Sequence, residues 1–167
     1  MQRTLLCAIA LATLTLMGCV RTDPISRSIA ASVRRGPDAR VVLADHAAFA
    51  WDRVCIFGPY TSDAEVDRIS GIPGAAAHAF DIRENDGIDA LLFTTGRQVV
   101  ASVAHGRRGA DFGPEVVDRC YSREQAVFSV RVPPPNSWGE IGPLLVNDRP
   151  FSRRISWRGP RLGEWTR

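Results

Sequence analysis

This 167-residue chain contains no lysine, and all 21 of its Lys and Arg residues are arginine. The chain therefore cannot use a Schiff-base lysine, the phosphate-binding lysine of a P-loop or a serine–lysine dyad. The 18 acidic residues leave a formal net charge of only +3, which is far from the surplus typical of nucleic-acid-binding proteins. These two features exclude several catalytic mechanisms and argue against a nucleic-acid partner.

Local catalytic motifs are also missing. The three histidines, His46, His78 and His105, do not form the H-E-x-x-H pattern that places two ligands on one helix face. The sequence has no G-x-S-x-G elbow for a nucleophilic serine, and its glycines form no phosphate loop after a strand. We therefore expect no cofactor and no catalytic residue that can be named from a local motif.

One acidic stretch invites a comparison with calcium loops. It contains Asp81, Glu84, Asp86 and Asp89, but Arg83 stands where a ligand is required and Gly87 is one position late. The stretch is therefore predicted to be a solvated turn, and no metal is expected.

Long hydrophobic runs are scarce, and one uncharged, largely apolar run covers residues 4–17. About 14 residues are too few for a transmembrane helix, which needs about 20. Arg3 before the run and a small residue after it are typical of a secretory signal. The segment ends in L-M-G-C, which resembles the lipobox of bacterial lipoproteins. That resemblance implies removal of residues 1–18 and acylation of Cys19, which would anchor the chain stably in a membrane.

The resemblance also suggests a location in the cell. The positions after Cys19 hold Val20 and Arg21 instead of the aspartate that retains some lipoproteins in the inner membrane. The chain is therefore expected at the periplasmic side of the outer membrane. Loss of residues 1–18 removes Arg3 and no acid, which lowers the side-chain charge balance from +3 to +2. The alternative is an ordinary signal peptide with an incidental cysteine.

Residues 19–40 are polar and rich in small side chains, which predicts a flexible tether between the lipid and the folded part. A helix over residues 25–35 is the alternative, because Ile25, Ile29 and Val33 recur every four positions.

Two cysteines remain after Cys7 and Cys19 are accounted for. In an oxidising compartment, Cys55 and Cys120 are predicted to form one disulfide. The alternative is a pair of small buried hydrophobic side chains.

The folded core is expected over residues 41–135. A β-rich run to Phe57 leads into Gly58-Pro59-Tyr60-Thr61, and Ser62 to Glu65 fits the capping box of a helix that should end near Gly71. The segment W-D-x-x-x-x-F-G-P-Y-T resembles one found in small bacterial lipoproteins, a resemblance that implies no activity. Tyr60 is a candidate partner contact, and the alternative is a loop side chain packed over the sheet edge.

Further strands are predicted over residues 90–94, 98–104 and 126–132 from their apolar content and alternation. The sum is an α+β fold: a small antiparallel sheet with one or two short helices in a single domain. At the level of architecture alone, this is similar to the periplasmic lipoproteins that assist outer-membrane barrel assembly.

The remaining segment, residues 136–167, is rich in arginine and tryptophan and is expected to pack on the core. From Arg149 onward it holds six arginines and one acid, Glu164. Guanidinium groups suit anionic lipids and glycan carboxylates. Candidate contact residues here are Arg153, Arg154, Trp157 and Arg158. The alternative is a final strand whose arginines face water.

Two functions of different class follow. The first is a non-catalytic lipoprotein that binds a protein, glycan or lipid at the cell envelope. The second is a periplasmic hydrolase or envelope-modifying enzyme whose site joins distant residues, such as His105 with Asp111. The lack of a local motif favours the first.

Overall fold

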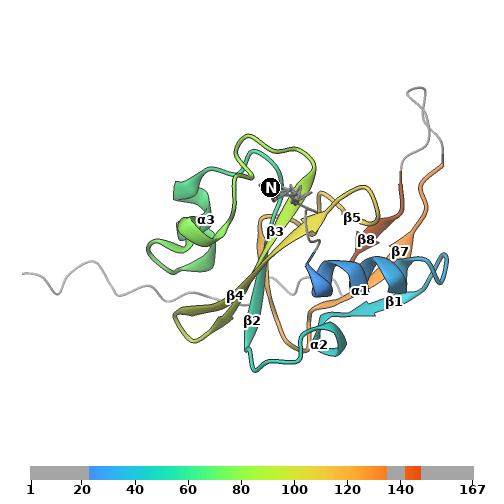
Figure 1. Ribbon diagram of the computed structural model, residues 1–167, viewed down its shortest axis with the longest axis horizontal. Helices are drawn as coiled ribbons and strands as arrows, with labels where there is room; N and C mark the ends of the chain where they lie inside the picture. Colours follow the sequence, from blue (N-terminus) through green and yellow to red (C-terminus); the bar gives the residue numbers. More distant parts are fainter. Residues whose placement is uncertain (1–22, 135–141, 148–167) are drawn as a thin grey trace, which may run out of the picture.

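The computed structural model describes residues 23–134 and 142–147 (Figure 1). Its helices are α1 (Pro24–Val33), α2 (Leu43–His46), α3 (Asp63–Ser70) and the 3-10 helix η1 (Ala75–His78). Its strands are β1 (Arg40–Val42), β2 (Arg53–Phe57), β3 (Ile88–Thr95), β4 (Gln98–Gly106), β5 (Asp111–Phe112), β6 (Arg119–Ser122), β7 (Val127–Arg131) and β8 (Leu144–Val146). The predicted α+β class is confirmed.

The strands form two four-stranded sheets, where the sequence predicted one. The first sheet has the order β4-β3-β2-β6 and is antiparallel throughout. The second has the order β1-β7-β8-β5, in which β5 and β8 run parallel and the other pairs are antiparallel. The strands predicted over residues 90–94, 98–104 and 126–132 correspond to β3, β4 and β7, and Gly96 lies in the turn between the first two with a φ of 55°.

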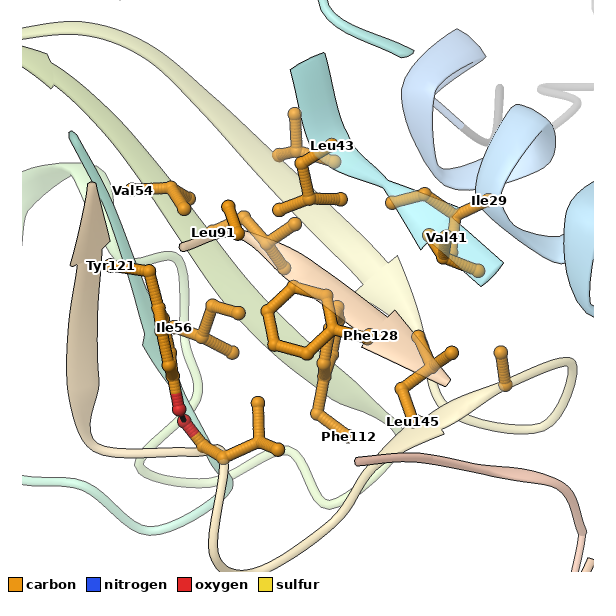
Figure 2. Packing of buried hydrophobic residues seen from close by; sticks show 14 of the residues in the cluster. Ile29, Val41, Leu43, Val54, Ile56, Leu91, Phe112, Tyr121, Phe128 and Leu145 are labelled. Carbon is orange, nitrogen blue, oxygen red and sulfur yellow. Dashed lines mark hydrogen bonds between the residues drawn. The ribbon is translucent and has the colours of Figure 1, made fainter. Parts of the chain in front are cut away.

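A shared hydrophobic core lies between the two sheets (Figure 2). Val54 and Ile56 of β2 point into it, and Phe128 of β7 enters it from the other sheet. Phe128 makes edge-to-face contacts with Phe112 and Tyr121, with ring centroids 5.4 Å apart in both cases. Buried aromatic pairs of this kind stabilise a core beyond their area burial.

A second core covers the opposite face of the first sheet. Cys55 and Phe57, which alternate with the residues of the main core along β2, pack there against α3 and η1. In Figure 1, α3 lies on one side of strands β2, β3 and β4, and α1 lies on the other. Because this sheet is covered on both faces, its central strands are buried almost continuously.

Helix α3 forms where the capping box predicted it. The Ser62 side chain accepts from the Glu65 N–H, the Glu65 carboxylate accepts from the Ser62 N–H, and Gly71 ends the helix in the left-handed conformation. This reciprocal arrangement satisfies backbone donors that a helix start otherwise leaves unpaired.

The prediction of a flexible tether over residues 19–40 is wrong for residues 24–33, which form helix α1. Asp23 caps it by accepting the Ile25 N–H at 2.8 Å, Pro24 occupies its first turn, and Ile29 is fully buried in the main core. Residues 24–33 therefore belong to the folded part of the chain, as the alternative helical interpretation of this segment suggested. None of the helices within residues 23–134 and 142–147 is both long and apolar enough to span a membrane.

Candidate functional sites

The loop from β2 to α3 holds Tyr60 in an unusual backbone conformation. Tyr60 follows Pro59 in the turn and has a φ of 66°, in the left-handed region that bulky residues rarely adopt. A turn with proline at its second position and a positive φ at its third normally takes glycine or asparagine at the third. Tyr60 therefore occupies a position that its own conformational preferences disfavour.

Three hydrogen bonds join this turn to other segments. The Thr61 hydroxyl donates to the Asp118 carboxylate, with Oγ1 and Oδ1 2.7 Å apart, and the Gly58 N–H donates to the same oxygen at 3.4 Å. The Tyr60 N–H donates to the Ile82 carbonyl at 2.7 Å. These bonds come from two other segments of the chain, so the surrounding fold maintains the strained residue.

The side chain of Tyr60 points away from the fold, with 68% of its surface exposed. Phe80 is a second exposed aromatic residue, at 45%, and it also has a left-handed backbone, with a φ of 58°. The loops that carry them are joined by the bond from Tyr60 to Ile82. We call Tyr60 and Phe80 the aromatic pair. Tyr60 does not pack over the sheet edge as the alternative interpretation required.

A buried polar cluster lies where β3 and β4 pair. Asp89 and His105 are register partners on these strands, and both are fully buried. Arg107 forms a two-pronged ion pair with Asp111, at 2.7 and 2.8 Å, and its Nε lies 3.7 Å from Asp89 Oδ1. That oxygen has no hydrogen-bond partner within the described residues, whereas Oδ2 accepts from the Phe112 N–H at 3.4 Å.

The cluster shifts the pKa of two of its members. Burial, aided by the neighbouring Asp111 carboxylate, raises the pKa of Asp89 from 3.8 to about 7, although Arg107 opposes the shift. Burial also lowers the pKa of His105 below its usual 6.5. Both shifts favour the neutral form, because a charge is costly where water cannot reach it.

The enzyme hypothesis proposed that His105 pairs with Asp111. In the structure, the two ring nitrogens of His105 have other hydrogen-bond partners. Its Nε2 lies 2.8 Å from the Ala110 carbonyl, and its Nδ1 lies 3.0 Å from the Ser26 hydroxyl. Because a carbonyl can only accept, Nε2 carries the proton and Nδ1 accepts from Ser26. The Asp111 carboxylate is instead engaged by Arg107. The hydrogen bond between Ser26 and His105 ties α1 to β4, and the two residues are 3% and 0% exposed.

A pocket of about 460 Å³ opens above Ser26, beside α1. We call it the α1 pocket. Three exposed arginines surround it: Arg27, Arg34 and Arg108. The rest of its lining consists of small residues, namely Ser26, Ala30, Gly87, Gly106 and Gly109. Such a pocket suits an anion, since guanidinium groups bind oxyanions with two parallel hydrogen bonds.

A larger pocket of about 810 Å³ lies between the end of α3 and β6. Its walls include Arg53, Arg68, Asp118 and Cys120. Two of its polar groups are already engaged, because Arg53 donates to the Ser70 carbonyl and Asp118 holds the turn that carries Tyr60. This pocket is less suited to an anion than the α1 pocket, because a carboxylate lines it.

The predicted disulfide is confirmed. Cys55 and Cys120 are register partners on β2 and β6, and their sulfur atoms are bonded. Cys19 lies outside the described residues, as do Arg153, Arg154, Trp157 and Arg158. The predicted solvated turn is correct for Asp81, Glu84 and Asp86, which are exposed. It is wrong for Asp89, which is buried beside Arg107. Among the described residues, no group of three His, Cys, Asp or Glu side chains could hold a metal ion.

Sequence analysis did not identify Phe80 or the α1 pocket. The signal for α1 was present, because Asp23 and Pro24 match an N-cap and first-turn proline before an apolar repeat. No local sequence signal predicts the left-handed backbone of Phe80, because this position holds neither glycine nor asparagine.

Comparison of the chain with protein-family models, with curated proteins and with solved structures gives no significant match.

Proposed function

We propose that this protein is a non-catalytic lipoprotein of the bacterial cell envelope. It is anchored through a lipid on Cys19, faces the periplasm from the outer membrane, and binds an envelope partner through the aromatic pair. The lipobox L-M-G-C supports the anchor, and the disulfide is consistent with an oxidising compartment.

The observation that carries the binding function is the strained, exposed Tyr60. A left-handed backbone at a bulky residue costs free energy, and an exposed ring recovers little of it through burial. Strained residues of this kind cluster at active sites, ligand-binding sites and switch regions. Tyrosine also contributes strongly to protein interfaces, because it offers a large rigid contact area with a polar tip. A contact outside the chain would therefore explain why the position holds tyrosine rather than glycine.

The start of α1 supports a position close to the membrane. At about 3.6 Å per residue, the chain from Cys19 to the N-cap Asp23 reaches at most about 14 Å. A lipid on Cys19 would hold the folded domain near the bilayer surface rather than at the end of a long tether.

Replacing the anchor residue tests the localisation. In a Gram-negative host, the wild-type chain should fractionate with outer-membrane vesicles, and Cys19→Ser should move to the soluble periplasmic fraction, because no acyl chain is attached. The measurement is immunoblotting of sucrose-gradient fractions, combined with mass spectrometry of the N-terminal peptide. Cys7→Ser serves as the matched control and should fractionate like the wild type. Equal fractionation of Cys19→Ser and wild type would contradict the proposed anchor.

Replacing Tyr60 by glycine should have opposite effects on stability and on binding. We expect Tyr60→Gly to leave the free energy of unfolding unchanged or raise it by up to about 1 kcal/mol, because glycine adopts a positive φ without strain. The same change should abolish the partner crosslink formed by a photoreactive residue at Phe80. The measurements are urea unfolding and in-cell photo-crosslinking.

Two controls separate binding from folding. Tyr60→Phe keeps the ring and should keep the crosslink, while a photoreactive residue at the exposed Val132 should not give the same product. An undiminished crosslink in Tyr60→Gly would show that the aromatic pair does not form the contact surface.

A further inference from the structure

We propose that the α1 pocket binds the phosphate group of an anionic lipid headgroup in the membrane that anchors the protein. This inference rests on the proposed lipid anchor for the source of the phosphate. The chemistry of the pocket itself is independent of that anchor.

The geometry of α1 brings two of the charges to one wall. Arg27, Ala30 and Arg34 stand at spacings of three and four, which places them on one face of the helix. Arg108 lies on the opposite side, in the turn between β4 and β5. The alanine between the two helix arginines leaves room for a ligand that both can reach.

Small residues keep the pocket open. Gly87, Gly106 and Gly109 contribute no side chain, and a Cβ placed on Gly109 would lie 3.5 Å from the Ala30 Cβ. The Ser26 hydroxyl below them is held by His105 and by the Gly106 N–H. A volume of about 460 Å³ falls within the range of small-molecule sites.

The three arginines form no ion pair with any residue in the described part of the chain. No carboxylate is among the residues that line the pocket. Asp23 caps α1, and Asp89 and Asp111 face Arg107. The lining of the pocket therefore carries positive charge alone. Guanidinium groups match phosphate better than they match a single carboxylate oxygen, because their parallel N–H groups engage two oxygens at once.

The position of α1 favours a lipid as the source of the phosphate. Asp23 at the start of the helix lies within about 14 Å of Cys19 along the chain, so a lipid on Cys19 keeps the helix close to the headgroup layer. Anionic headgroups also attract arginine side chains that lie close to a membrane surface.

The test measures binding to the purified full chain in nonionic detergent at constant ionic strength. Dihexanoyl phosphatidylglycerol is the anionic probe, dihexanoyl phosphatidylcholine is the zwitterionic control, and inorganic phosphate is the competitor, all followed by isothermal titration calorimetry. We expect phosphatidylglycerol to bind, phosphatidylcholine to bind at least about tenfold more weakly, and phosphate to compete with the anionic probe.

Matched variants distinguish a pocket from general surface charge. Arg27→Gln combined with Arg108→Gln should raise the Kd for phosphatidylglycerol about tenfold or more, whereas Arg40→Gln with Arg97→Gln removes the same charge elsewhere and should change it less than about twofold. Gly109→Leu keeps every charge but fills the pocket. It should weaken binding like the first pair, and its backbone φ does not require glycine.

Each contrary result has a specific meaning. Equal loss in the two arginine pairs, or an unchanged Kd in Gly109→Leu, would overturn the pocket. Binding of phosphate without phosphatidylglycerol would overturn the lipid source and leave a free-phosphate site. Absence of both would overturn the proposal entirely. Because these measurements are made in solution, their failure is distinguishable from a failure of Cys19→Ser to change fractionation.

Discussion

At pH 8 the Asp89→Asn variant should be more stable than the wild type, and this advantage should shrink as the pH falls to 5. The Asp89 pKa is raised to about 7 in the folded protein from an ordinary value of 3.8, so between these values the folded state binds a proton that the unfolded state does not. The wild type therefore loses stability as the pH rises through about 7. Two pKa units of this range correspond to about 3 kcal/mol between pH 5 and pH 8.

Urea unfolding of both proteins at pH 5, 6, 7 and 8 measures the effect. The difference between them is the useful quantity, because His46 and His105 have lowered pKa values and add an opposite slope to both proteins. Asparagine matches the shape of aspartate and can still accept from the Phe112 N–H, but it carries no charge. Asp81→Asn changes an exposed carboxylate and controls for net charge. A pH-independent difference between wild type and Asp89→Asn would show that Asp89 does not titrate in this range.

The groups around Asp89 explain why its charge is so poorly stabilised. Among the described residues, Arg107 is the one cation that faces it at ion-pair distance, but Arg107 directs two N–H groups of its guanidinium to Asp111. The Asp111 and Asp118 carboxylates raise the Asp89 pKa further, by repulsion. Because Arg107 is already paired with Asp111, a charged Asp89 would be a buried charge without a full partner. The protonated, neutral form of Asp89 therefore costs less free energy in the interior.

The parts of the fold that sequence analysis predicted are those encoded by short, local patterns. The Ser62–Glu65 capping box determined the start of α3, and Gly71 determined its end, because both act within one turn of backbone. Strands β3, β4 and β7 were predicted from uninterrupted or alternating apolar residues. The disulfide was predicted from the count of cysteines together with the expected oxidising compartment.

The second sheet was not predicted, because its strands depend on distant partners. Strands β1, β5 and β8 are two or three residues long, and each is defined by pairing with a segment far away in the sequence. Strand β1, for example, places Val41 opposite Phe128. Such short runs carry too few residues for a period to be recognised.

The candidate sites were predicted only in part, for the same physical reason. Tyr60 was identified because the turn sequence around it is distinctive, and Phe80 was missed because its loop carries no such signal. Asp89 was interpreted as part of a solvated turn, yet the register of β3 against β4 places it opposite His105 in the interior. The α1 pocket requires α1 and the turn after β4 to meet in space, which spacing along the chain does not indicate.

Loss of the bond between Cys55 and Cys120 should greatly lower the free energy of unfolding. Replacing Cys55 and Cys120 together by alanine is expected to lower the free energy of unfolding by about 4 kcal/mol, because the bond closes a loop with a sequence separation of 65 and restricts the unfolded chain. That is a large share of the 5–15 kcal/mol typical of a domain. Urea unfolding at one pH measures it as a fall in the transition midpoint.

Chemical reduction of the wild type separates the cross-link from the side chains. Cys55 is fully buried against α3, so alanine also removes sulfur atoms from the second core. Reduced wild type keeps those atoms and loses only the bond. If chain entropy dominates, reduced wild type and the double variant should unfold at nearly the same urea concentration, both well below the oxidised protein. A double variant much less stable than reduced wild type would instead assign the effect to packing under α3, and an unchanged midpoint after reduction would refute the entropic account of this bond.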